Sequence, residues 1–150
     1  MSDAPIDRQT VFSGTKDVPE ALAFDEERLS SWLEKAVPEF KGPLTARQFK
    51  GGQSNPTYMI ESASGRYVLR RKPPGKLLPS AHAVDREFRV LSALHGAGFP
   101  VARPLILCDD DAVVGTMFYL IDFTEGRVYW VPDLPDCDNQ ERSAIYDAMN

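Results

Sequence analysis

The chain has few of the residues that build membrane spans or disulfide scaffolds. Its apolar runs are far shorter than the ~20 residues that a membrane-spanning helix needs. The N-terminus, MSDAPIDRQT, is polar and acidic, without the apolar stretch of a signal peptide. Two cysteines occur, Cys108 and Cys137, and they lack metal-type spacing. These scarcities predict a cytoplasmic protein with reduced thiols and no membrane partner.

The common nucleotide-binding fingerprints are missing as well. Neither the GxxxxGK[ST] phosphate loop nor the GxGxxG dinucleotide motif occurs, and the sequence has no internal repeat or low-complexity segment. The composition is otherwise ordinary, since 43% of the 150 residues are hydrophobic and 26% are charged. Such a chain is long enough to form one folded domain with a real core.

Positive charge is concentrated in the middle of the chain, although the net charge is −5. Residues 46–104 hold 10 basic and 3 acidic side chains, whereas residues 1–45 hold 5 and 9, and residues 105–150 hold 2 and 10. A basic block between acidic flanks favours a confined anionic ligand over DNA or RNA, which both flanks would repel. We therefore expect no nucleic-acid partner, and a solvated charged surface stays as the alternative.

Hydrophobic periodicity predicts the regular elements. A helix is predicted over residues 25–37 with Asp25 as its N-cap, a second from Ser80 to His95, and a third that begins at Asn139. Residues 1–19 show no periodicity and are expected to be a flexible leader. Alternating apolar residues predict a three-stranded meander and then a hairpin, and hence an α+β fold with a five-stranded antiparallel sheet. The predicted strands are 44–49, 57–61, 67–70, 105–108 and 113–122.

A glycine pair interrupts the first two predicted strands. Gly51 and Gly52 let the backbone approach a ligand closely and turn N–H groups toward phosphate oxygens. Ser54 and Asn55 add short polar groups beside them. Most glycine pairs between strands are simple turns or bulges, so this stretch alone is a weak indication of phosphate binding.

A carboxylate lies within the apolar stripe of the helix predicted from residue 80. Glu87 shares that stripe with Val84, Phe88, Leu91 and Leu94. Burying a carboxylate costs several kcal/mol unless it is paired, so we expect Glu87 to meet a cation of the preceding strand. Arg70 is the nearest candidate. The alternatives are a glutamate that reaches water from the edge of the stripe, and strand cations that face solvent.

Several stretches in this order resemble one family. GGQSNPTY, YVLRRKPPGKLLPSAH, REF, FPVARPL and FYLIDFTEGR are similar to aminoglycoside phosphotransferases and choline kinase-like proteins. Within that family, the kinase domains associated with acyl-CoA dehydrogenases match best, and the resemblance runs from about Phe40 to the C-terminus. It implies a protein-kinase-like N-terminal lobe over residues 20–123. Residues 124–150 would then be the hinge exit and the beginning of a second lobe.

The resemblance also implies roles for particular residues. Arg70 stands where the family often has the lysine that contacts ATP, and Glu87 is its helix partner. The stretch that includes Gly51, Gly52, Ser54 and Asn55 would cover the phosphates. Phe123 and Thr124 would offer a carbonyl and an N–H to a purine, with Ile121 behind them. Because arginine replaces lysine, Arg71 and Lys72 stay open as alternative phosphate contacts.

The implied activity is transfer of the γ-phosphate of ATP or GTP, with Mg²⁺, to the hydroxyl of a small molecule. The acceptor would be a hydroxyacyl-CoA or an aminoglycoside-like compound. No histidine–x–aspartate loop supplies a catalytic base here, and Asp133, Asp136 and Asp138 are more typical of a linker than of metal ligands. We therefore expect no catalytic residues in this segment, Mg²⁺ ligands outside it, and no turnover by it alone. A non-catalytic nucleotide-binding or scaffold module is the alternative, and the oligomeric state stays open.

Overall fold

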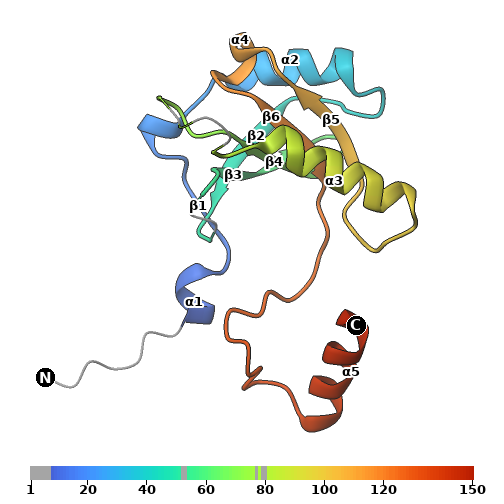
Figure 1. The fold of residues 1–150 in the computed structure, drawn as a ribbon. Helices are drawn as coiled ribbons and strands as arrows, with labels where there is room; N and C mark the ends of the chain where they lie inside the picture. Colours follow the sequence, from blue (N-terminus) through green and yellow to red (C-terminus); the bar gives the residue numbers. More distant parts are fainter. Residues whose placement is uncertain (1–7, 52–53, 77, 79–80) are drawn as a thin grey trace, which may run out of the picture. The chain divides into compact units, whose positions relative to one another are not determined.

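The computed structural model describes residues 8–51, 54–76, 78 and 81–150 (Figure 1). Within them the chain divides into two compact units, which are described separately below. Residues 14–125 form the larger unit, and residues 8–13 with 126–150 form the smaller one.

The larger unit is built on an antiparallel sheet of six strands in the order β1-β2-β3-β4-β6-β5. This confirms the predicted α+β class and corrects the strand count from five to six. The additional strand, β1, spans two residues and pairs with the end of β2, which is too short for an alternating pattern to reveal. The strands are β1 (Thr15–Lys16), β2 (Leu44–Phe49), β3 (Thr57–Ser62), β4 (Gly65–Arg71), β5 (Pro104–Cys108) and β6 (Phe118–Asp122).

One face of this sheet is covered by helix α2 (Glu26–Ala36). Its N-cap is Asp25, as predicted, because the carboxylate accepts a hydrogen bond of 2.9 Å from the Arg28 N–H. The 3₁₀ helix η1 (Glu20–Leu22) precedes it. The apolar stripe of α2 is buried against every second residue of the central strands. The core includes Leu29, Leu33 and Val37 of this stripe, and Tyr58, Ile60, Leu69, Phe118 and Leu120 of the sheet.

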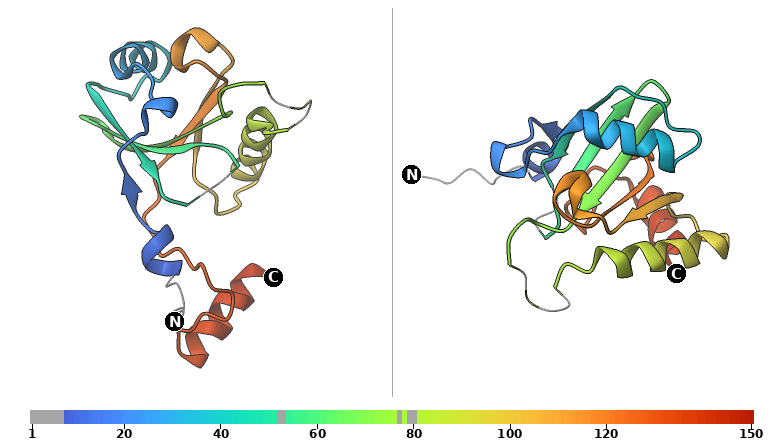
Figure 2. Two further views of the ribbon diagram at one scale, coloured as in Figure 1. Left: turned by 90° about the vertical axis from the view of Figure 1, so that its left-hand side faces the viewer. Right: turned by 90° about the horizontal axis from the view of Figure 1, so that it is seen from above.

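Helix α3 (Val84–Gly96) packs on the sheet next to β5 and β6 (Figure 2). The alternation of side chains along a strand separates two sets of residues. Those that face α2 form the core, and the intervening ones, among them Val68 and Arg70, face α3. The α3 face is less completely covered than the core, and the candidate site lies there.

Two predicted boundaries are wrong. The strand predicted over 113–122 begins only at Phe118, because residues before it form a short helix, α4 (Asp111–Val114). The Asp110 side chain caps α4, and Gly115 ends it at a φ of 92°, a conformation that favours glycine. Helix α3 begins at Val84, after the predicted start at Ser80, which lies outside the described residues.

The smaller unit contains helices α1 (Arg8–Phe12) and α5 (Asn139–Met149). The Phe12 and Trp130 rings pack with their centroids 5.6 Å apart. Helix α5 is capped by Asp138, one residue before the predicted cap. The sequence indicated no regular structure before residue 20, yet α1 and β1 both form there. Among the described residues, no helix is both long enough and apolar enough to cross a bilayer.

Candidate functional site

Two rows of cross-strand neighbours lie on the α3 face of the sheet. Strand register places Arg70 opposite Thr57 on one side and Tyr119 on the other, which makes a polar row. Val68 lies opposite Met59 and Ile121 in the same way, which makes an apolar row. The two rows are adjacent because their β4 members are two residues apart, about 7 Å along a strand.

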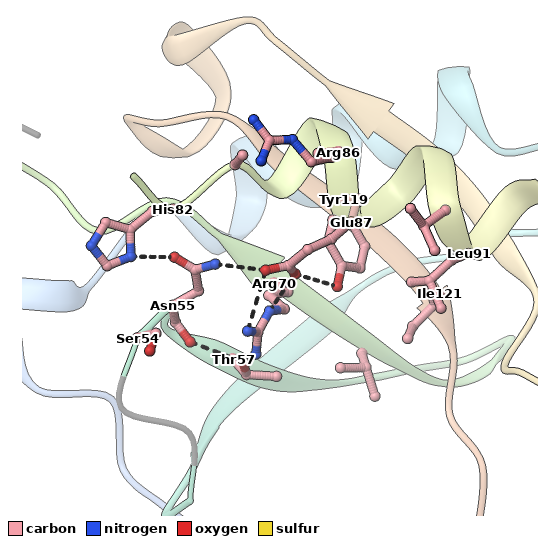
Figure 3. A pocket seen from close by; sticks show the side chains of 13 residues that line it. Ser54, Asn55, Thr57, Arg70, His82, Arg86, Glu87, Leu91, Tyr119 and Ile121 are labelled. Carbon is pink, nitrogen blue, oxygen red and sulfur yellow. Dashed lines mark hydrogen bonds and ion pairs between the residues drawn. The ribbon is translucent and has the colours of Figure 1, made fainter. Parts of the chain in front are cut away.

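Helix α3 and the segment before it close these rows into a pocket of about 870 Å³ (Figure 3). Drug-sized ligands and cofactors occupy pockets of roughly 300–1,000 Å³. The lining residues are Ser54, Asn55, Thr57, Val68, Arg70, His82, Ala83, Arg86, Glu87, Val90, Leu91, Tyr119 and Ile121.

An ion pair joins the sheet to α3 inside this pocket. The Arg70 Nε donates to the Glu87 Oε2 at 2.7 Å, and another Arg70 nitrogen donates to the Thr57 hydroxyl at 3.1 Å. The pairing expected from the helix stripe is thus confirmed. The side chains stay 28% and 36% exposed respectively, so the pair is accessible from the pocket rather than sealed in the core.

Two further donors hold the Glu87 carboxylate. The Tyr119 hydroxyl donates to Oε2 at 3.0 Å, and the Asn55 amide donates to Oε1 at 3.1 Å. Burial, together with the neighbouring Glu87 charge, raises the pKa of the Tyr119 phenol well above its ordinary value. Sequence reasoning did not identify Tyr119. The observation that identifies Tyr119 is the pairing of β4 with β6, which places this residue directly beside Arg70.

His82 completes the hydrogen-bonded group. Its Nδ1 lies 2.8 Å from the Asn55 Oδ1. The sequence placed His82 in the first turn of a helix. Instead it precedes α3, with a φ of 57°, in the left-handed region that few residues other than glycine adopt. That conformation is a property of the folded connection between β4 and α3, and no local pattern signals it.

The predicted glycine stretch is only partly described. Gly52 lies outside the described residues, while Gly51 is half-buried, two residues after the end of β2. Ser54 is exposed at the rim of the pocket. The Asn55 side chain is 2% exposed and is occupied by Glu87 and His82. Within the described part of this stretch, Ser54 therefore presents the accessible hydroxyl.

The two other cations near the end of β4, Arg71 and Lys72, do not share the pocket with Arg70. Arg71 is 3% exposed on the opposite face of the sheet. Its guanidinium donates to the carbonyls of Leu22 and Val114, both at 2.7 Å, and to the Tyr58 hydroxyl at 3.1 Å. Lys72 follows the strand and does not line the pocket. Of the three residues that the sequence left open, the geometry places Arg70 in the pocket.

The apolar row lies toward the end of β6, where the predicted hinge begins. Ile121 lines the pocket, and Phe123 follows after one residue, with its N–H donating to the Arg66 carbonyl at 3.3 Å. The Arg66 guanidinium lies 4.5 Å from the centre of the Phe123 ring and pairs with Glu125 at 2.7 Å. Within the described residues, no backbone hydrogen bond engages the Phe123 carbonyl or the Thr124 N–H. Neither Phe123 nor Thr124 is among the described residues that line the pocket, and the two groups belong to one trans peptide unit, so they point in opposite directions.

Comparisons with known proteins agree with this geometry. Residues 45–149 match the model of the phosphotransferase enzyme family. That match covers well over half of the chain. The chain belongs to the phosphotransferase enzyme family. Its α+β sheet with a helix-borne glutamate paired to a strand cation is the N-terminal lobe of a protein-kinase-like fold.

Relatives of the chain include both dehydrogenase-named proteins and a phosphotransferase structure. The chain is 44% identical over 140 residues to acyl-CoA dehydrogenase family member 11 of Mus musculus, a match that covers 91% of this chain and 18% of the relative. It is 45% identical over 137 residues to family member 10 of the same species, covering 91% and 13% respectively. A crystal structure from Ralstonia eutropha JMP134, designated an aminoglycoside phosphotransferase, matches with a TM-score of 0.70 and 44% identity.

This family member spans only a small part of its relatives. It covers less than a fifth of the length of those two dehydrogenase-named proteins and 35% of the phosphotransferase structure, while 83% of this chain is matched there. Among the described residues, no three histidine, cysteine or acidic side chains gather in a group that could hold a metal ion. The one carboxylate among the described pocket-lining residues, Glu87, is held by Arg70, Tyr119 and Asn55, so none of these residues is assigned to a metal.

Proposed function

We propose that the chain is the nucleotide-binding portion of a small-molecule kinase, which transfers the γ-phosphate of ATP or GTP to a substrate hydroxyl. The observation that carries the proposal is the pair of adjacent rows in one pocket, a polar row around Arg70 and an apolar row around Val68. A nucleotide has a similar division, with an aromatic base whose faces are apolar at one end and anionic phosphates at the other.

Arg70 serves the phosphate end. Its guanidinium is oriented by Glu87 and Thr57, and the side chain remains 28% exposed. A fixed planar cation recognises phosphate oxygens through charge-assisted hydrogen bonds. Ser54 at the rim supplies a hydroxyl on the same side. Phosphoryl transfer depends mainly on such positioning and electrostatic stabilisation, and this unit contributes the positioning.

The purine end lies against Val68, Ile121 and Leu91. Beyond these apolar side chains, the Phe123 carbonyl and the Thr124 N–H are adjacent acceptor and donor groups on the chain that leaves β6. The two groups belong to one trans peptide unit and point in opposite directions, so one of them, and not both, can bind the edge of a purine ring. This single contact does not distinguish ATP from GTP. The apolar row excludes water from the base, which strengthens that hydrogen bond.

The acceptor that we propose is a hydroxyacyl-CoA. The support is that relatives sharing 44–45% identity carry the name acyl-CoA dehydrogenase, whereas the aminoglycoside alternative rests on the designation of the structural relative. Catalytic base and metal ligands are not assigned to this chain. We therefore expect nucleotide binding from residues 1–150, and phosphoryl transfer only from a protein that also supplies those groups.

Calorimetric titration with ATP, GTP and adenosine tests the proposal. We expect dissociation constants for ATP in the range of roughly 10 μM to 1 mM, which corresponds to about 4–7 kcal/mol of binding free energy. Arg70→Met should weaken ATP binding and leave adenosine binding unchanged. An absence of ATP and GTP binding by the folded chain would refute the proposed function. Nucleotide binding by the longest natural form without transfer to any hydroxyl acceptor would favour the scaffold module.

A further inference from the structure

A continuous series of hydrogen bonds runs from His82 to the ion pair of the pocket (Figure 3). His82 contacts Asn55, Asn55 contacts Glu87, and Glu87 contacts Arg70. His82 and Asn55 are 27 residues apart in the sequence, one before α3 and the other before β3. The series therefore joins the segment that precedes the helix to the stretch that follows the glycine pair.

The direction of each hydrogen bond follows from the carboxylate. A carboxylate paired with arginine accepts only, so the Asn55 group facing Glu87 is the amide NH₂. The Asn55 oxygen must then face His82. An oxygen requires a donor, so the His82 Nδ1 carries a hydrogen. The other orientation of the Asn55 amide would set its oxygen against the Glu87 carboxylate.

We propose that His82 is a positioning residue for nucleotide phosphates: its Nδ1–H fixes the Asn55 amide, which orients Glu87 and thereby Arg70. This inference rests on the proposed function of the pocket. Asn55 is 2% exposed, so its amide cannot exchange these partners for bulk water, and losing either one leaves a buried polar group unsatisfied. The left-handed backbone of His82 holds the ring in place at some conformational cost, which is common at functional sites.

Direct contact of His82 with a phosphate is the competing role, because the ring also lines the pocket. Two substitutions separate the roles. In His82→Asn the amide nitrogen lies near the position of Nδ1, and asparagine tolerates the left-handed backbone. In His82→Gln the longer amide reaches the position of Nε2 instead. The first variant keeps the donor to Asn55, and the second keeps a donor toward the pocket.

Calorimetric titration of the folded variants with ATP and with adenosine is the test. We expect His82→Asn to bind ATP within about threefold of the parent and His82→Gln to bind it about tenfold more weakly. Adenosine affinity should stay the same in both. If His82→Gln does not fold, His82→Asp replaces it, because aspartate has the shape of asparagine without the donor. Three results would overturn the proposal. They are parent-like ATP affinity in the variant that lacks the donor to Asn55 (His82→Gln or His82→Asp), weak ATP binding by His82→Asn, and equal losses of ATP affinity in both variants.

A ligand-free measurement keeps this inference separable from the proposed function. Long-range ¹H–¹⁵N spectra distinguish the two neutral tautomers of histidine. We expect the Nδ1–H tautomer for His82 in the parent chain and its loss in Asn55→Ala. The Nε2–H tautomer in the parent would overturn the positioning role whatever the chain binds. Conversely, a parent chain that shows the expected tautomer but binds no ATP would refute the nucleotide site and leave the hydrogen-bond series established.

Discussion

Arg70 and Arg71 are neighbours on β4, and their guanidinium groups lie on opposite faces of the same sheet. The Arg70 Nε is 2.7 Å from a carboxylate oxygen in an open pocket. Arg71 nitrogens are 2.7 Å from the carbonyls of Leu22 and Val114 in the core, where the side chain is 3% exposed. The same residue type therefore binds neutral backbone on one face and an ion-pair partner on the other. Substitutions at Arg70 and at Arg71 should therefore differ in their effect on stability.

Substituting methionine at each position compares them at similar side-chain length. Arg71→Met removes three hydrogen bonds and takes the donor from the Val114 carbonyl, whereas the Leu22 carbonyl keeps the Tyr58 hydroxyl as a donor. A lost hydrogen bond costs about 1 kcal/mol, and a buried group left unsatisfied costs about 1–3 kcal/mol. We expect the free energy of unfolding to fall by about 3 kcal/mol or more. Arg70→Met should cost about 1 kcal/mol, because solvent reaches its ion pair. Urea unfolding followed by circular dichroism measures both, and equal losses would contradict the two-face assignment.

The Arg70–Glu87 pair should be coupled in nucleotide binding. We expect Arg70→Ala and Glu87→Ala each to weaken ATP binding by about tenfold, because the cation is lost in one and its orientation in the other. The double variant should be weaker by less than the product, with a coupling energy of about 1 kcal/mol. Titration calorimetry on the four proteins gives the cycle.

A matched control for this cycle lies on a more exposed part of the same unit. Arg103 and Glu39 form an ion pair of 2.7 Å that does not line the pocket. Glu39→Ala should therefore leave ATP affinity unchanged. Strictly additive effects at Arg70 and Glu87, or an equal loss at Glu39, would show that the pocket pair does not act as a unit.

Part of this arrangement was predictable from residue patterns alone. The stripe of α3 showed a carboxylate among apolar residues, and pairing that carboxylate with β4 required only that buried charges be compensated. Core residues of α2 and the meander followed from periodicity in the same way. Each of these predictions rests on a pattern of residues close in the sequence, and each pattern is compatible with one structural arrangement.

The remaining contacts depend on how separate segments meet. Val113 and Val114 favour a strand by intrinsic propensity, but the Asp110 cap and the left-handed Gly115 place them in the short helix α4. From the sequence, Arg71 cannot be distinguished from the two neighbouring cations, because the packing of α2 decides which face of the sheet is buried. Likewise, the contact of His82 with Asn55 requires a left-handed residue between β4 and α3. Such choices are made by tertiary packing, which overrides local propensity.

Tyr119 makes stability depend on alkaline pH. Its pKa is raised above the ordinary value of 10.0, first by burial and then by the Glu87 carboxylate. The folded chain therefore keeps the phenol neutral while the unfolded chain ionises it. The stabilising contribution is complete below about pH 10 and is lost as the pH rises toward the folded pKa. Near pH 8, Tyr119→Phe should be less stable by about 1 kcal/mol through its lost hydrogen bond.

The difference in free energy of unfolding between the parent and Tyr119→Phe should therefore decrease from about pH 9 to about pH 11, because tyrosine ionises in this range and phenylalanine does not. Urea unfolding at a series of pH values measures it. Burial also raises the pKa of Tyr58, but that residue is present in both proteins and cancels in the difference. A gap that stays constant across this range would show that Tyr119 ionises alike in the folded and unfolded chains.

Val68 allows the base end of the pocket to be tested separately from the phosphate end. Val68→Thr keeps the side-chain shape and replaces one methyl group of the apolar row with a hydroxyl. Covering that hydroxyl with a purine costs about 1 kcal/mol, so we expect about fivefold weaker binding of both ATP and adenosine. Arg70→Met should weaken ATP alone. Calorimetric titration of both ligands into both variants decides the assignment: a Val68→Thr effect on ATP but not on adenosine would mean that the phosphates, and not the base, lie over Val68.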